Sequence, residues 1–248
     1  MIQNSFVLLE RISAGLERNI WGQGIRDWND FANAKKIKGI SNTRKLYYER
    51  RLKEAKKELY SLNSSYFIDL LPSSEMWRLY DFFKDSAVFL DIETTGIYEE
   101  DSLVMIGLYD GINTKTMLRS SLDFNSLKRE LSQYKLLVTF NGSSFDVPFL
   151  NKRYPGLLPR IPHFDVKSIT RRAGLAGGLK DIERSIGIRR NGILERFNGG
   201  DALTLWRMYK ASGDEYYLNL LIEYNEYDII NLKKVAESAI KSLKNKIS

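Results

Sequence analysis

The feature that most limits the possible folds is a short apolar run, Ala87 to Ile92, interrupted only by the carboxylate of Asp91. An apolar run of four to eight residues is typical of a strand buried on both faces. Hydrophobic residues make up 43% of the 248 residues and charged residues 28%, which is the composition of a folded globular protein rather than a disordered one. The chain is therefore expected to bury this run in the centre of a sheet.

Further strand and helix patterns follow the apolar run. Strand patterns lie at 103–109, 114–119 and 135–140, and a helical period lies at 122–133. Asp110-Gly111-Ile112-Asn113 separates the first two strands and predicts a hairpin turn. Four of the five prolines, from Pro148 to Pro162, predict an extended loop, and the chain beyond them reads as mainly helical. We therefore expect an α/β fold, a mixed central sheet flanked by helices.

The chain divides by composition into three segments. Residues 1–65 read as a small helical region with few strand patterns, and residues 66–85, with Pro72-Ser73-Ser74, read as a linker. The expected α/β domain covers 86–248. Neither a signal peptide nor a stretch of about 18 uninterrupted apolar residues is evident. We therefore expect a soluble cytoplasmic protein that is not associated with a membrane.

Positive charge is concentrated in the first segment. The chain has 38 Lys and Arg against 31 Asp and Glu, a net charge of +7. Between Lys35 and Glu58 alone there are ten bases and three acids, also an excess of seven. Two interpretations stay open. The stretch is either a solvated helix face with pairs such as Glu49 and Lys53, or a contact face for nucleic acid.

Residue types that are missing exclude several kinds of site. Cysteine is absent and His163 is the single histidine, which excludes thiolate zinc sites and sites with several histidines. A metal in this protein must therefore be held by oxygen, and hard cations such as Mg²⁺ or Mn²⁺ suit carboxylates.

Carboxylates lie where such a cation would be held. Asp91 and Glu93 are two apart at the end of the first strand, so both side chains point to one face. A divalent cation would offset the cost of burying Asp91. The alternative is that Asp91 caps the turn Thr94-Thr95-Gly96 while Glu93 is solvated.

Two more acids follow later in the chain. Asp146 comes after the strand pattern at 135–140, where it would hold a metal or simply cap a helix. Tyr224 and Asp228 are four apart on a helix whose apolar face includes Leu221 and Leu232. Asp228 therefore occupies a position where an aliphatic residue would be expected, which points to a function.

Together these elements resemble the three motifs of the DEDD exonuclease superfamily. The motifs read Asp91-Ile92-Glu93-Thr94-Thr95-Gly96, Asn141-Gly142-Ser143-Ser144-Phe145-Asp146 and Tyr224-Asn225-Glu226-Tyr227-Asp228. The tyrosine is typical of the DEDDy branch, because position 223, where the other branch has histidine, is Glu223. Leu179-Lys180-Asp181-Ile182-Glu183 and His163-Phe164-Asp165 are similar to the YprB-like group. Residues 16–28 resemble the degraded helix-hairpin-helix segment that precedes some of these domains.

The resemblance implies a ribonuclease H-like fold and 3′→5′ exonuclease activity that uses two divalent cations, Mg²⁺ or Mn²⁺. The cations would be held by Asp91, Glu93, Asp146 and Asp228, while Tyr224 would orient the attacking water. His163 reads as a structural histidine. Asp165 reads either as a group outside the metal ligands or as a replacement for one of the four. The residues expected to contact the substrate are Thr94, Thr95, Asn141, Phe145, Arg171 and Arg172.

The expected partner is single-stranded DNA or RNA, or the 3′ end of a duplex. Eight bases between Lys167 and Arg196 form a second basic stretch that would follow a phosphate backbone. Two alternatives remain at this stage. One is an endonuclease of RNase H or junction-resolving type, and the other is a nucleic-acid binding module without catalysis.

Overall fold

The computed structural model describes residues 1–96, 102–190, 192–197 and 200–247. Within these residues five strands form one sheet in the order β3-β2-β1-β4-β5. The strands are β1 (Ala87–Thr94), β2 (Leu103–Tyr109), β3 (Thr114–Leu118), β4 (Leu136–Thr139) and β5 (His163–Asp165). Central β1 is antiparallel to β2 and parallel to β4, so the sheet is mixed as predicted. β5, which has three residues, was not predicted, because it is too short to show a strand period.

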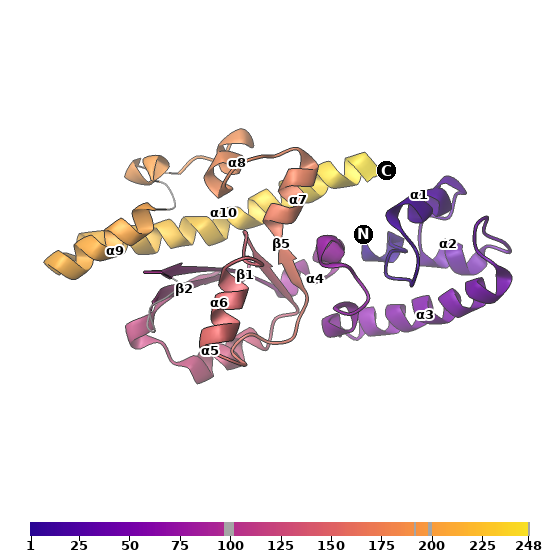
Figure 1. Cartoon of the computed structure of the whole chain (residues 1–248), viewed down its shortest axis with the longest axis horizontal. Helices are drawn as coiled ribbons and strands as arrows, with labels where there is room; N and C mark the ends of the chain where they lie inside the picture. The colour runs from indigo at the N-terminus through magenta and orange to yellow at the C-terminus, as the bar shows by residue number, and fades with distance from the viewer. Residues whose placement is uncertain (97–101, 191, 198–199, 248) are drawn as a thin grey trace.

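Helices cover both faces of the sheet (Figure 1). One face carries α5 (Phe124–Leu131) and α6 (Asp146–Arg153), and the other carries α7 (Val166–Ala173) and the long α10 (Glu215–Ile247). Alternate residues of β1 serve the two faces. Val88 and Leu90 pack with α5 and α6, whereas Phe89 joins the core on the α10 side. The strand period therefore turns Asp91 and Glu93 toward α10.

The proline-rich segment differs from the prediction in one place. Pro148 lies in the first turn of α6, and the irregular loop begins only after Arg153. A proline is tolerated there because the first backbone N–H groups of a helix have no partner within the helix.

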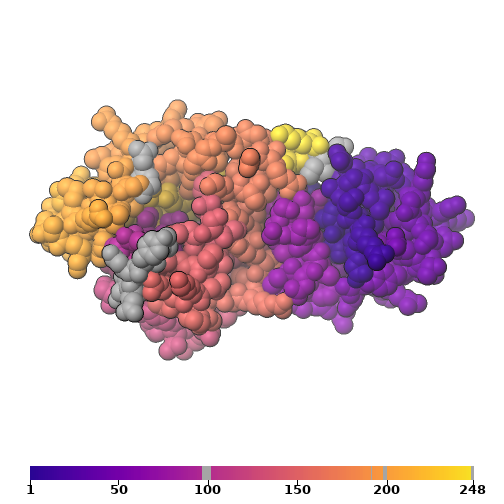
Figure 2. Space-filling view, in the orientation of Figure 1, coloured from indigo at the N-terminus to yellow at the C-terminus, as the bar shows by residue number. Residues whose placement is uncertain are grey.

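The N-terminal region is helical, as predicted. It contains α1 (Ala14–Gly22), α2 (Trp28–Asn33) and α3 (Asn42–Tyr60), each begun by a side chain that accepts a backbone hydrogen bond. Those N-caps are Ser13, Asp27 and Ser41. Figure 2 shows this region as one end of the molecule.

Residues 66–85 are folded rather than extended. They include η3 (Ser73–Leu79) and α4 (Tyr80–Phe83), and their buried Trp77 belongs to a hydrophobic core that also contains Trp28 and Phe89. A buried ion pair joins this segment to α1, because Arg78 Nη2 lies 2.9 Å from Glu17 Oε2. The boundaries of the three predicted segments stay a prediction. No helix among the described residues has the length and hydropathy needed to span a membrane.

Candidate active site

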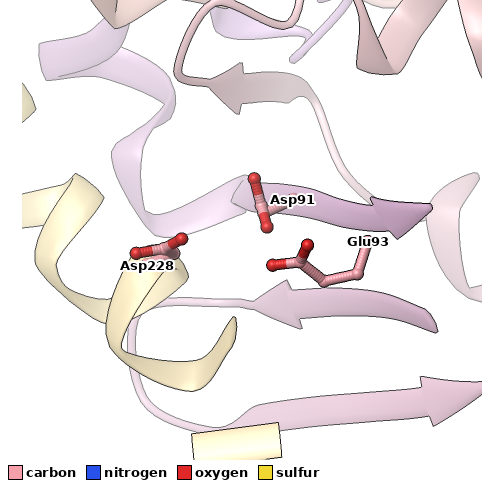
Figure 3. Close-up of side chains that lie close together, drawn as sticks. All are labelled: Asp91, Glu93 and Asp228. Atoms are coloured by element: carbon pink, nitrogen blue, oxygen red, sulfur yellow. The ribbon is translucent and has the colours of Figure 1, made fainter. Parts of the chain in front are cut away.

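Three of the predicted metal ligands meet between β1 and α10. Each of Asp91, Glu93 and Asp228 offers a carboxylate oxygen, and these oxygens lie within 4.8 Å of one another. Figure 3 shows the side chains pointing toward a common centre. All three are half-buried. The arrangement arises because the strand period directs two acids to one face and the helix on that face supplies the third.

The buried face of α10 brings Asp228 to the sheet. Leu221, Tyr224, Leu232 and Val235 are all buried at spacings of three or four residues, and Asp228 continues the same face. The apolar neighbours hold the helix against β1 and β2. The carboxylate is therefore placed by the packing of the residues around it.

Asn225 fixes the carboxylate of Asp91. Its Nδ2 donates to Asp91 Oδ2 over 2.8 Å. Gly107 lies opposite Asp91 in β2, and a Cβ atom there would lie 1.9 Å from Asn225 Oδ1. The glycine therefore leaves the space that the amide fills. In the sequence Asn225 was only part of a motif, although a glycine inside an apolar strand signals close approach by another group.

Asp146 lies near the cluster of Asp91, Glu93 and Asp228 but is not part of it. It is the first residue of α6 and not its N-cap, and its Oδ1 accepts a hydrogen bond from the Ile92 backbone N–H over 3.1 Å. It is not one of the three acids whose oxygens lie within 4.8 Å of one another. Even so, its charge contributes to raising the pKa of both Asp91 and Glu93. Asp146 therefore acts on the site at least through its field.

The carboxylates resist ionisation because they are buried together. Burial and the neighbouring carboxylates raise the pKa of Asp91 well above its ordinary value, and burial followed by the charges of Asp228 and Asp146 raises the pKa of Glu93 to about 8. Burial raises the pKa of Asp146 and that of Asp228 to about 6 each. A divalent cation would relieve this repulsion. The donors are all oxygen, so the site fits a hard cation such as Mg²⁺ or Mn²⁺.

Tyr224 is held in its protonated form beside these acids. Burial, then the charges of Asp228 and Glu93, raise its pKa. Lys180 Nζ lies 4.1 Å from the centre of the Tyr224 ring, and burial together with the charge of Arg190 lowers the pKa of Lys180 to about 8. The phenol is therefore a hydrogen-bond donor at neutral pH and not a base.

Arg190 holds the other side of Asp228. Its guanidinium is buried, with Nε 2.8 Å from Glu183 Oε2 and Nη2 2.6 Å from Glu183 Oε1, and Nη2 also donates to Asp228 Oδ1. The same group lies 5.5 Å from the centre of the Tyr224 ring. One oxygen of Asp228 is thus tied to a cation, and the positive charge opposes the rise of the Asp228 pKa.

The burial of Arg190 corrects the prediction that the bases between 167 and 196 form one surface that follows a backbone. Arg190 is in the interior, and Arg184 and Arg189 pair with Glu195. Arg172 pairs with Glu75 over 3.0 Å and donates to the Ser74 carbonyl. Periodicity along the chain could not indicate this, because the partners come from other turns and elements.

A sequence profile described as the RNase H superfamily matches residues 88–240. The chain belongs to the RNase H superfamily. The matched range includes all four predicted carboxylates and Tyr224. The finer assignment of this RNase H domain to the DEDDy branch and the YprB-like group stays a prediction. No curated protein matches the chain.

The RNase H domain is similar to several solved structures. One is the Escherichia coli exoribonuclease RNase D, involved in structured RNA processing, with 17% identity over 68% of this chain and a TM-score of 0.47. Another is the Pyrobaculum calidifontis family B DNA polymerase, with 13% identity over 65% and a TM-score of 0.44. The Aedes aegypti Nibbler EXO domain has 12% identity over 69% and a TM-score of 0.40, with 85% of that chain covered. The present chain spans 43% of RNase D and 24% of the polymerase.

Asp165 and His163 organise the loop next to the RNase H carboxylates. Asp165 accepts from the backbone N–H groups of Asn141 over 2.8 Å and Ser143 over 3.0 Å, which fixes the loop between β4 and α6. His163 Nε2 lies 2.8 Å from Thr139 Oγ1, and burial lowers its pKa. Neither belongs to the three-carboxylate cluster. The His163 contact agrees with the structural role expected of that residue, and the choice between the two roles of Asp165 stays a prediction.

A groove borders this loop. Its volume is about 440 Å³, and Asn141, Lys167 and Arg171 are among its lining residues. Lys167 Nζ donates to Asn141 Oδ1 over 3.2 Å. The other predicted substrate contacts are not in its lining. The ring of half-buried Phe145 lies 5.9 Å from that of Phe149. Thr94 is the last residue of β1, and Thr95 follows it.

Proposed function

We propose that this protein is a metal-dependent 3′→5′ exonuclease that hydrolyses single-stranded DNA or RNA. The observation that carries the proposal is the convergence of Asp91, Glu93 and Asp228 beside Tyr224. Superfamily membership supports phosphodiester hydrolysis, and the resemblance to the DEDDy motifs supports the exonuclease mode and its polarity.

The chain's own residues have separate tasks in this proposal. Asp91, Glu93 and Asp228 would hold two divalent cations, with Asp146 adding negative charge from the neighbouring helix. When bound, the cations supply positive charge that activates the attacking water and stabilises the leaving 3′ oxygen. The protonated Tyr224 donates a hydrogen bond that orients this water. Asn225 and Arg190 restrain Asp91 and Asp228, so that each carboxylate faces the centre from a fixed direction.

The substrate strand would approach past the loop between β4 and α6. Arg171 and Lys167 outnumber Asp165 among the charged residues that line the groove there, which favours phosphate. Asn141 would contact the terminal nucleotide, and Phe145, Thr94 and Thr95 stay proposed contacts near the acids. Arg172 is occupied by Glu75, so the proposal depends on Arg171 instead.

The test uses single-stranded DNA and RNA labelled at the 5′ end, with Mn²⁺, Mg²⁺ or chelator. We expect a metal-dependent ladder that shortens from the 3′ end. Asp228→Asn should abolish it. Glu223→Gln, an exposed position on the same helix, should retain it.

Two other outcomes would overturn the proposal in different ways. A circular single strand has no end, so its cleavage would indicate an endonuclease. Binding that persists in chelator, with no product at any metal concentration, would indicate a binding module without catalysis.

A further inference from the structure

The exposed face of α3 carries an uninterrupted line of bases. Arg50, Lys53 and Lys57 are spaced by three and four residues, so they lie on one side of the helix. Leu46 and Tyr60 continue the line at its two ends and are 59% and 61% exposed. We call these five residues the α3 stripe. It combines cations with apolar groups, and all five side chains are exposed.

The acids of α3 do not neutralise the stripe. Glu49 pairs with Lys45, not with Lys53 as the spacing suggested. Glu54 Oε2 lies 2.8 Å from Arg51 Nη1, and Glu58 accepts from Asn63 Nδ2 over 2.7 Å. Each acid therefore has a partner beside the stripe. Among the described residues, the three bases of the stripe form no ion pair.

The aromatic end of the stripe is held in place. The Tyr60 ring lies edge-on to Phe82 with centroids 5.8 Å apart, and its hydroxyl accepts from Gln3 Nε2 over 3.1 Å. The ring is therefore restrained while most of its surface stays in solvent. An exposed, restrained ring next to cations suits the stacking of an unpaired base.

We propose that the α3 stripe is a second binding surface for the nucleic-acid strand, apart from the carboxylate site. The positive charges of Arg50, Lys53 and Lys57 complement the negative phosphates of a nucleic-acid backbone, and Tyr60 offers a surface on which a nucleobase can stack. The inference rests on the proposed function for the identity of the ligand. Figure 1 shows α3 beyond the sheet, at the opposite end of the molecule from α9 (Asp201–Ser212). The stripe would therefore hold a part of the strand away from the reacting end.

The experiment measures binding without catalysis. Fluorescence anisotropy in chelator follows the affinity for labelled single strands of about 5 and about 40 nucleotides over a range of salt concentrations. The stripe variant replaces Arg50, Lys53 and Lys57 with Gln, which keeps the propensity for a helix. The matched control replaces three exposed lysines elsewhere, Lys128, Lys152 and Lys234, with Gln.

We expect a specific change in the salt dependence. Each phosphate contact contributes about 0.7 to the slope of log affinity against log salt for a single strand, so three lost contacts should lower the slope by about 2. The same arithmetic gives a loss of roughly tenfold to a hundredfold in affinity for the long strand at about 0.1 M salt. The short strand should lose much less. Tyr60→Leu should weaken the long strand without changing the slope.

Other results would overturn the inference. An unchanged slope in the stripe variant, or an equal loss in the control, would leave no role for α3 in binding this ligand. A stripe variant that loses an acidic protein partner but no nucleic acid would assign the surface to another class of macromolecule. Cleavage of a short strand in Mn²⁺ separates the two proposals. If the exonuclease proposal is wrong, neither the wild type nor any variant cleaves this strand. If only the stripe proposal is wrong, the wild type and the stripe variant both cleave it.

Discussion

Glu93 should make the stability of the metal-free protein depend on pH. Burial and neighbouring carboxylates raise its pKa from 4.5 to about 8, so the folded chain keeps a proton that the unfolded chain releases. Because the folded state binds more protons in this interval, the free energy of unfolding falls as pH rises, by about 1.4 kcal/mol per pH unit for one proton. From about pH 6.5 to about pH 8 the loss is about 1.6 kcal/mol, less than the full slope would give because Glu93 is half ionised at the upper limit.

Thermal unfolding in chelator measures this effect. A loss of about 1.6 kcal/mol lowers the melting temperature of a chain of this size by about 3–6 °C. Glu93→Gln keeps the shape of the side chain without its charge, so the variant should melt above the wild type at about pH 8 and depend less on pH. Glu223→Gln, exposed on α10, should follow the wild type. Equal wild-type melting temperatures at the two pH values, or an unchanged slope in Glu93→Gln, would refute the reasoning.

Three further predictions concern the same site. Saturation with Mn²⁺ at about 100 times the dissociation constant should stabilise the protein by about 2.7 kcal/mol in thermal unfolding, and Asp91→Asn should remove most of that gain. Gly107→Ala should displace Asn225 and weaken Mn²⁺ binding in calorimetry, whereas Gly22→Ala, which meets no atom within 4 Å, should not. Arg190→Met should cost about 3–5 kcal/mol in denaturant unfolding because it leaves Glu183 buried without its partner, and pairing it with Glu183→Gln should recover part of the loss.

Elements with strong periodicity could be predicted from the sequence. β1 and β2 follow from apolar runs, and the buried face of α10 follows from spacings of three and four. The proximity of Asp91, Glu93 and Asp228 was also expected, because an acid within an apolar pattern is costly unless the fold uses it. These predictions depend on local pattern, which a single sequence contains.

Contacts between distant segments could not be predicted in the same way. Nothing near Arg190 in the sequence indicates that its guanidinium is buried against Asp228, because helix packing and not local composition determines that burial. The choice of Lys45 over Lys53 as the partner of Glu49 was equally hidden, since both lie four residues away on the same helix. β5 depends on its pairing with β4 rather than on its own three residues.

The site is divided between an early strand and a late helix, which has a consequence for synthesis. Asp91 and Glu93 leave the ribosome long before Asp228 and Tyr224, and a folded sheet cannot supply the missing carboxylate or phenol by itself. A nascent chain whose α10 segment has not yet left the ribosome therefore has an incomplete carboxylate cluster. Translation order alone keeps the emerging polypeptide from presenting the assembled acidic cluster to the messenger RNA beside it.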